Sequence, residues 1–402
     1  MATPPATAHP GKQPRFRVRA ASLQDYPQIA ALEARYGLGI KTFEEWRHLW
    51  VNNPVYRELQ PDWPIGWVLE DDDKQIVASM GNIPLLYEFE GKRVLAASGR
   101  SWVADVAYRS PALLLLDYVV NQSHVDLYLN NTASQNSLAP LNALECSRVP
   151  VGVWDEIAYW VTNYRGFYRS VVAMKNYRLT RPFGLPETAN RPWTRMAALR
   201  CRLAKPLSYP LAAAAFLRDR LATTSLREGD VEVQPCSGFD DRFDMFWETL
   251  RRNNPHTLLA LHTRDVLEWH FKHQLLANRL WIETVVDGSR LAAYAIFDKT
   301  LNSKSGFTHV RLVDYQSADH STHLLAPLLS WALRKCRSEG VHLLEHTGRW
   351  LERGELLDTA VPYRLPTSTW SYFYRANSPQ LKEALKDRQV WAPSLFDGDA
   401  TL

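Results

Sequence analysis

The sequence predicts an α/β protein with two similar domains in tandem, each a mostly antiparallel twisted sheet flanked by helices. Its length of 402 residues exceeds what one hydrophobic core usually organises, so two domains are expected. Hydrophobic residues make up 46% and charged residues 22%, which suits a globular chain with a sizeable core. The order of strand and helix patterns over residues 15–170 also recurs over 229–402.

The first half opens with strictly alternating residues over Arg15–Arg19, which predict a strand. Ser22 suits the N-cap of a helix over Leu23–Tyr36, and apolar residues at helical spacing predict a second helix over Thr42–Asn52. The proline-rich stretch 53–64 is expected to be a loop.

Three strands and an apolar helix follow in the first half. Alternating patterns predict strands over Gly66–Glu70, Ile76–Leu86 and Val94–Asp105. Pro111 suits the first turn of a leucine-rich helix that continues to about His124. The remaining elements expected here are a strand over Val125–Leu129, a loop over Asn130–Ser134, a short helix to Cys146 and a strand over Val149–Val153.

The second half repeats this order. Trp67 aligns with Trp281, and Asp105, at the end of the third strand, aligns with Asp314. Leu127 aligns with Leu343 in the next strand. The expected strands are 230–234, 280–286, 290–298, 308–314, 341–346 and 370–375, and the expected helices are 240–253, 263–273, 321–340 and 353–361.

The segments outside these two patterns have different compositions. Residues 1–14 are rich in Ala, Thr and Pro and are expected to form a disordered tail, whereas 171–228 form a connecting region. No apolar run reaches the ~18 residues of a membrane-spanning helix, so no transmembrane segment and a cytoplasmic location are expected. The four cysteines are widely spaced, which favours reduced thiols over a disulfide framework or a metal site.

The charge pattern narrows the class of partner. The net charge is +4, and the Lys and Arg residues are dispersed rather than clustered, so no nucleic-acid partner is expected. The chain contains no Gly-x-Ser-x-Gly, no phosphate-binding GxxxxGK[ST] loop and no Gly-x-Gly-x-x-Gly. These absences leave hydrolase, nucleotide-hydrolysing and dinucleotide-binding activities without support.

The element order resembles that of the GNAT family of acyl-CoA-dependent N-acyltransferases, twice over. Four segments of the first half carry this resemblance. They are Gly66–Glu70 with Ile76–Ala78, Asp105–Arg109 entering the leucine-rich helix, Asn131–Ser134 after the next strand, and Val149–Gly152 where the family's last hairpin begins.

The resemblance implies acetyl-CoA or another acyl-CoA as cofactor, with no metal. In the family, backbone N–H groups at the start of the helix after the central strand hold the pyrophosphate. The positions that match this turn are Val106, Tyr108, Arg109 and Ser110, whereas Asn131 and Ser134 match the side that holds the pantetheine. The turn lacks the family's glycines, and Pro111 has no N–H. Arg109 is therefore either a phosphate partner or a solvated surface residue, and Asn131 and Ser134 are either cofactor contacts or caps.

The resemblance also implies a carboxylate base on the central strand. Asp105 and its counterpart Asp314 are the candidates, with capping of a turn as the alternative role. Glu345 is a third candidate, because it ends a strand beside His346, and adjacent residues of a strand face opposite sides. No tyrosine occupies the family's acid position near Leu141, so the replacement acid is left open among residues such as Tyr128 and Cys146.

The sequence therefore predicts an acyltransferase that moves an acyl group from an acyl-CoA or related thioester to an amine or hydroxyl. The acceptor is expected to be a small molecule, a sugar or a lipid precursor, and the protein to be a monomer or homodimer. The missing glycines favour one alternative, a degenerate, non-catalytic tandem domain that serves as a binding or assembly partner. Transfer from aminoacyl-tRNA would require a basic groove, which the dispersed charge does not predict.

Overall fold

The computed structural model describes residues 15–151, 156–171, 209–219, 231–302, 305–319, 321–347, 363–366 and 371–402. The predicted tail 1–14, most of the connecting region 171–228 and the predicted helix 353–361 lie outside the described residues. Among the described residues, none of the helices has the length and apolar character needed to cross a membrane.

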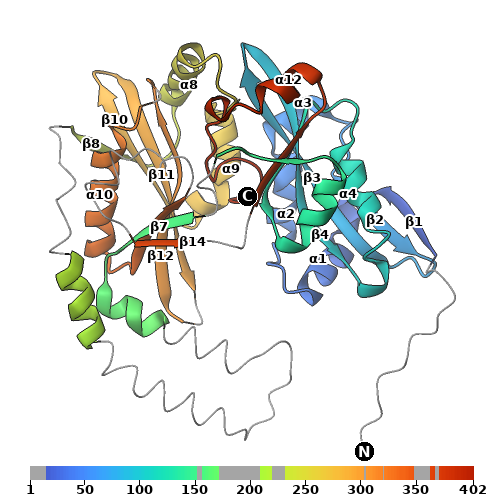
Figure 1. Cartoon of the computed structure of the whole chain (residues 1–402), viewed down its shortest axis with the longest axis horizontal. Coiled ribbons are helices and arrows are strands. Elements are labelled where there is room, and N and C mark those ends of the chain that lie inside the picture. The colour runs from blue at the N-terminus through green and yellow to red at the C-terminus, as the bar shows by residue number, and fades with distance from the viewer. Residues whose placement is uncertain are drawn as a thin grey trace, which may run out of the picture.

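Two mixed sheets stand side by side in the molecule (Figure 1). The first has the order β1-β2-β3-β4-β5-β15-β6, with β9 pairing to β3, and the second has the order β14-β7-β13-β12-β11-β10-β8. The strands of the first sheet are β1 (Phe16–Ala20), β2 (Gly66–Asp71), β3 (Ile76–Phe89), β4 (Lys92–Ala104), β5 (Leu127–Ala133), β6 (Ser147–Arg148), β9 (Leu259–Ala260) and β15 (Ser371–Ala376). Those of the second are β7 (Glu156–Val161), β8 (Val233–Cys236), β10 (Leu280–Asp287), β11 (Arg290–Asn302), β12 (Phe307–Ser317), β13 (Leu343–Thr347) and β14 (Tyr363–Pro366).

The two sheets have the same topology, and each takes one strand from the other half of the chain. In the first sheet β5 pairs antiparallel with β15, which comes from the C-terminal half. In the second sheet β13 pairs antiparallel with β7, which comes from the N-terminal half. The two sheets therefore do not coincide with the predicted segments 15–170 and 229–402, because β7 pairs in the second sheet and β15 pairs in the first.

The helices form one layer between the sheets and one layer outside each sheet. The central core joins α1, α2, α8, α9 and the C-terminal segment 391–402 to the facing sides of both sheets. A second core lies between the second sheet and α10, and a third lies between the first sheet and α4, α5. Figure 1 shows α10 on the outer side of the second sheet and the chain's C-terminus between the two sheets. The helices are α1 (Tyr26–Arg35), α2 (Phe43–Val51), α3 (Pro54–Leu59), α4 (Leu113–Val120), α5 (Leu138–Ala143), α8 (Asp241–Asn253), α9 (Arg264–Leu276), α10 (Leu325–Ser338) and α12 (Pro379–Ala384).

Three predicted elements differ from the structure for local reasons. The predicted loop 53–64 contains α3, because the Asn53 side chain caps the helix and Pro54 occupies its first turn. The predicted loop Asn130–Ser134 is largely the end of β5, which is extended by its pairing with β15. The predicted strand Val149–Val153 follows the two-residue strand β6, and its last two residues lie outside the described residues.

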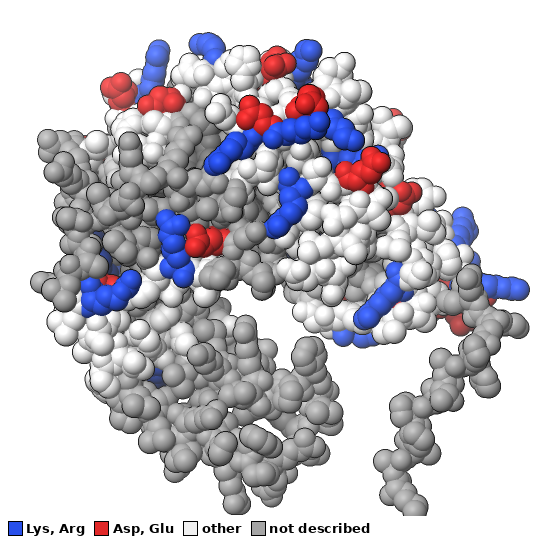
Figure 2. Space-filling view, in the orientation of Figure 1, with Lys and Arg blue, Asp and Glu red and all other residues white. Residues whose placement is uncertain are grey.

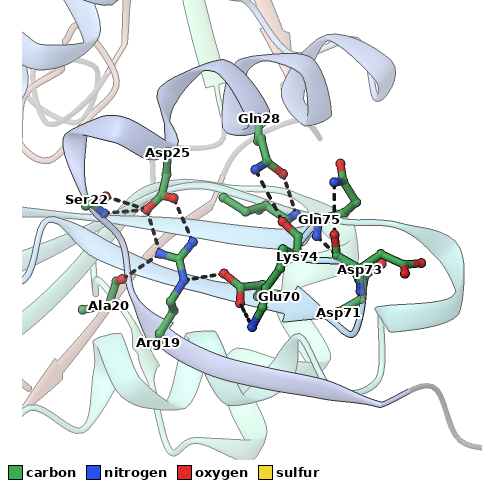
Figure 3. A network of polar contacts seen from close by, with 11 residues as sticks. Arg19, Ala20, Ser22, Asp25, Gln28, Glu70, Asp71, Asp73, Lys74 and Gln75 are labelled. Atoms are coloured by element: carbon green, nitrogen blue, oxygen red, sulfur yellow. Dashed lines mark hydrogen bonds and ion pairs between the residues drawn. The ribbon is translucent and has the colours of Figure 1, made fainter.

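Arg19 holds the first strand, the second strand and the start of α1 together (Figure 3). Its guanidinium donates two hydrogen bonds of 2.8 Å to the Asp25 carboxylate and one of 2.8 Å to Glu70 on β2. Asp25 also accepts hydrogen bonds from the backbone N–H and hydroxyl of Ser22. The Arg19 guanidinium lowers the pKa of the Asp25 carboxyl below its ordinary value. This bidentate pair fixes where α1 begins, and so positions the loop that follows the helix.

Asp105 and Asp314 do not occupy equivalent positions, which corrects the predicted alignment. With Trp67 and Trp281 superposed, the strand ladders place Asp314 opposite Val103, whereas Asp105 corresponds to Gln316. The prediction was wrong by two residues, because a strand pattern of period two fits equally well after such a shift. The ladders run through Val68, Ser79 and Val103 in the first sheet and through Ile282, Ile296 and Asp314 in the second.

Charges of both signs are interspersed on the face of the molecule shown in Figure 2. Ion pairs at the surface of the described residues include Arg93 with Glu58 and Arg251 with Glu248. On the described part of this face, the figure shows no continuous patch of one sign.

Candidate functional site

The parallel strands β4 and β5 separate halfway along their length. Their pairing is limited to Ala96–Ser98 against Leu127–Leu129, although β4 continues to Ala104 and β5 to Ala133. An irregularity in the β3–β4 ladder accompanies the separation, where Ser101 adopts a positive φ of 50°. Two parallel strands that diverge in this way leave a groove between their backbones.

Two neighbouring pockets occupy this groove. The outer pocket has a volume of about 590 Å³ and the inner pocket about 730 Å³. Both are lined by Leu38, Trp102, Ser134 and Ser137, so the two pockets adjoin each other. The hydroxyls of Ser134 and Ser137 lie 3.1 Å apart at this junction.

The outer pocket lies against the chain that leads into α4. Arg109, Ser110, Ala112 and Leu113 line it, and Leu113 is the first residue of the helix. The guanidinium side of Arg109 is exposed, so it is available to an anion. The N–H groups of Leu113, Leu114 and Leu115 donate to the carbonyls of Ser110, Pro111 and Ala112, so the start of α4 contributes only the partial positive charge of the helix dipole. The outer pocket is therefore chemically suited to a phosphate or pyrophosphate group.

The inner pocket carries charged side chains from four separate parts of the fold. Lys41 comes from the connection between α1 and α2, Glu45 from α2, Arg100 from β4 and Asp399 from the C-terminal segment. Asp399 accepts a hydrogen bond of 2.8 Å from the hydroxyl of Thr132 and lies 3.6 Å from the Arg100 guanidinium. Burial raises the pKa of the Asp399 carboxyl, while it lowers the pKa of the Lys41 ammonium to about 8.

The C-terminal segment is fixed in place by buried polar contacts. Asn131 on β5 donates to the Asp397 carbonyl and accepts from the Asp399 N–H. Gly398 has a φ of 64°, and a Cβ at this position would lie 2.7 Å from the Asn131 amide oxygen. Only glycine allows this close approach, which turns the chain so that Asp399 faces the pocket. The Tyr87 hydroxyl donates to Asp397 at 3.1 Å and anchors the segment to β3.

Glu33 is a further buried carboxylate beside the inner pocket. It lies on α1 and lines a small void together with Arg100 and Ser101, two residues that also line the inner pocket. Burial raises its pKa, and a hydrogen bond with Ser101 opposes that change. A second buried carboxylate thus lies close to the inner pocket without lining it.

Some of the predicted cofactor-binding residues line the outer pocket, and others line neither pocket. Arg109, Ser110 and Ser134 line the outer pocket. Val106 and Tyr108 lie in the short helix η2 (Val106–Tyr108) but do not line either pocket, and Val106 is 69% exposed. Asn131 is fully buried and holds the C-terminal segment, whereas its neighbours Asn130 and Thr132 line the inner pocket.

The predicted catalytic carboxylates lie outside the two pockets. The Asp105 carboxylate accepts hydrogen bonds from Arg35 at 2.7 Å and from the Tyr36 hydroxyl at 2.9 Å. Asp314 is fully buried, where His262 lies 3.1 Å from it and lowers its pKa. Glu345 accepts a hydrogen bond of 2.5 Å from Arg311 on the neighbouring strand of the second sheet.

The two residues considered as replacement acids are buried in the outer core of the first sheet. Tyr128 and Cys146 are not among the residues that line the two pockets. Burial raises the pKa of the Cys146 thiol to about 12 and raises that of the Tyr128 phenol as well.

Sequence reasoning missed Lys41, Arg100, Glu33 and Asp399. Glu33 had a signal, because it stands next to the buried Leu32 on the apolar side of a predicted helix. Asp399 lies in the segment Phe396–Asp399, and the two carboxylates of this segment are too few to predict a binding site from the sequence. Lys41 and Arg100 had no local signal, since only the fold brings them to one pocket.

No family model matches the sequence, and no curated protein matches it significantly. Among solved structures, a GCN5-related N-acetyltransferase from Kribbella flavida matches with a TM-score of 0.52 and 10% identity, covering 90% of this chain and 71% of that chain. One from Anabaena variabilis ATCC 29413 matches with a TM-score of 0.51 and 11% identity, covering 90% and 73%.

N-myristoyltransferase of Saccharomyces cerevisiae, solved with bound myristoyl-CoA, is also similar, with a TM-score of 0.49, 12% identity and coverage of 90% of this chain and 79% of that chain. At these identities the likeness is one of fold. This chain has the GNAT-type fold of acyl-CoA N-acyltransferases, which confirms the predicted fold class and the family resemblance in fold.

Proposed function

We propose that this protein is an acyltransferase that moves an acyl group from an acyl-CoA to an amine or hydroxyl of a small-molecule acceptor. One observation carries the proposal. Two adjoining pockets lie along the diverging strands β4 and β5, one at the start of α4 and the other lined by a buried carboxylate, Asp399.

The donor would occupy the outer pocket. Its pyrophosphate would lie near Arg109, Ser110 and the start of α4, where a cation, a hydroxyl and the positive end of the helix dipole favour an anion. Its pantetheine arm would then follow the groove towards the junction at Ser134 and Ser137, and the thioester would enter the inner pocket. This placement leaves the rest of the inner pocket for the acceptor.

The inner pocket has one group suited to take the acceptor's proton and two hydroxyls suited to bind the leaving sulfur. The acceptor nitrogen or oxygen attacks the thioester carbonyl carbon, the C–S bond breaks, and CoA leaves as a thiolate. We assign Asp399 as the group that takes the acceptor's proton, because its carboxylate lines the inner pocket and burial raises its pKa, which makes it a stronger base. The hydroxyls of Ser134 and Ser137 would donate a hydrogen bond to the leaving sulfur.

Calorimetric titration tests the donor site directly. CoA, acetyl-CoA and a series of longer acyl-CoAs are titrated into the full chain, with pantetheine as the control that lacks the pyrophosphate. We expect CoA to bind and pantetheine to bind more weakly by at least about tenfold. If no thioester and no CoA binds, the proposal is wrong.

The non-catalytic alternative is favoured by one local feature. The turn before α4 contains Pro111, which has no N–H to offer a phosphate, and no glycine lies between Arg109 and Leu113. A protein of this second kind would bind an acyl-CoA without release of free CoA. Detection of the free thiol with a chromogenic disulfide, across a panel of amines and alcohols, separates the two functions.

A further inference from the structure

Lys41 is a charged residue of the inner pocket whose ammonium has no direct partner among the described residues. Arg100 is 3.6 Å from Asp399, so these two charges offset each other. Glu45 is engaged at the start of α2, where its carboxylate accepts hydrogen bonds of 2.8 and 2.9 Å from the N–H and hydroxyl of Thr42. Within the described part of the chain, no hydrogen bond or ion pair involves the Lys41 ammonium.

The position of Lys41 separates it from the donor groove. It follows Leu38 and Ile40 in the connection between α1 and α2, which lines the inner pocket opposite the sheet. It does not line the outer pocket, where the start of α4 receives the donor in the proposed function. A ligand group that meets Lys41 therefore belongs to the acceptor rather than to CoA.

The electrostatics of this lysine call for an anion. Its ammonium interacts with Arg100 and Arg279, which disfavour its charge, and with Glu45 and Asp399, which favour it. Desolvation is the largest influence, and it lowers the pKa of Lys41 to about 8. A partly desolvated cation without a direct partner gains most from a ligand that brings a negative charge.

We infer that the acceptor carries a carboxylate beside its reacting amine or hydroxyl, and that Lys41 binds this carboxylate. The inference rests on the proposed function and narrows its acceptor to amino acids and related acids. The reacting group then faces Asp399 and the carboxylate faces Lys41, two residues from different segments that line the same pocket. Lys41 is a specificity-determining residue in this arrangement and takes no part in bond making.

The test uses the smallest product of such a reaction. N-acetylglycine and its uncharged analogue N-acetylglycinamide are titrated calorimetrically into the CoA-loaded full chain. We expect the acid to bind at least about tenfold more tightly than the amide, as hydrogen bonds to charged groups allow. In Lys41→Met this preference should be lost. Lys92→Met is the control, because it removes an exposed lysine at the start of β4, and it should retain the preference.

The outcomes separate this inference from the proposed function. Equal binding of acid and amide to the wild type, binding of neither, or a preference that survives in Lys41→Met each overturns the inference. If CoA fails to bind, the proposed function is wrong, and the same titrations into the CoA-free chain still decide whether the pocket prefers the acid. Should Lys41→Met fail to fold, shown by its thermal unfolding curve, the wild-type comparison of acid and amide decides alone.

Discussion

Thr132, near the end of β5, donates a hydrogen bond of 2.8 Å to the carboxylate of Asp399, which lies 267 residues further along the chain. This contact joins the diverging strand of the first sheet to the C-terminal segment. The segment reaches this position because β15 pairs with β5 and returns the chain to the first sheet. The exchange of strands between the halves is therefore what brings Asp399 into the inner pocket.

Asp399→Asn should lower turnover while leaving the affinity for CoA unchanged. The amide keeps the shape of the side chain but cannot take a proton from the acceptor, so we expect a loss of about 10²- to 10⁴-fold in kcat. Release of free CoA thiol measures turnover, and calorimetry measures CoA binding.

Asp105→Asn provides the comparison for that variant. Its carboxylate is held by Arg35 and Tyr36 outside the pockets, and the arginine side chain is 57% exposed, so the pair contributes at most about 1 kcal/mol. We expect near-normal turnover. An equal loss in both variants, or a loss confined to Asp105→Asn, would contradict the assignment of Asp399 and favour the base that the sequence alone predicts.

Arg109→Ala should weaken the binding of CoA by about tenfold without changing the binding of pantetheine. The guanidinium lines the outer pocket, where the pyrophosphate of the donor is proposed to lie, and a charge-assisted hydrogen bond is the interaction removed. Calorimetric titration of both compounds measures the difference.

Arg290→Ala is the matched control, because this arginine is exposed at the turn between β10 and β11 in the second sheet. It should bind CoA as the wild type does. If Arg109→Ala also binds CoA normally, the arginine is a solvated surface residue, which is the alternative that the sequence left open.

The sequence was sufficient to predict the order of elements but not the pairing of the exchanged strands. The aromatic segment 370–375 predicts a strand, yet the pattern does not encode whether its partner is β5 or a strand of its own half. A sequence pattern also does not encode the register of a strand. The alignment of Asp314 with Asp105 was wrong by two residues, because two registers that differ by two residues place the same face of the strand inwards. The sequence could place Arg109 and Ser110 beside a pocket because the strand–turn–helix geometry before α4 is local, and it could place Ser134 there because this residue directly follows β5. Lys41 and Asp399 meet only through long-range packing.

Phe373→Ala should destabilise the first sheet although the residue belongs to the C-terminal half. Phe373 on β15 is 2% exposed and packs in the core between the first sheet and α4. Removing a buried aromatic ring costs about 3–5 kcal/mol. Urea unfolding followed by tryptophan fluorescence and by circular dichroism measures the change.

Leu365→Ala is the control for this prediction. Leu365 lies on β14 in the second sheet and is 56% exposed, so its truncation should change the free energy of unfolding by less than about 0.5 kcal/mol. The exchange of strands predicts that both optical probes shift together in Phe373→Ala. A transition in which the first sheet unfolds without the second would show that the exchanged strands do not couple the halves.

Glu283→Gln should stabilise the protein at alkaline pH and change little at acid pH. Glu283 on β10 is 1% exposed, and its Oε2 atom has no hydrogen-bond partner. Burial raises the pKa of this carboxyl from 4.5 to about 8, although Lys335 opposes the shift. Between these two values the folded chain holds a proton that the unfolded chain has released, so stability falls as pH rises, by up to about 1.4 kcal/mol per pH unit.

The glutamine cannot ionise, so the difference in the free energy of unfolding between variant and wild type should be small near pH 5 and grow towards pH 8. Urea unfolding across this range measures it, with Glu248→Gln, whose side chain is 48% exposed, as the comparison that should show no such trend. A constant difference across the range would mean that Glu283 is ionised in the folded protein.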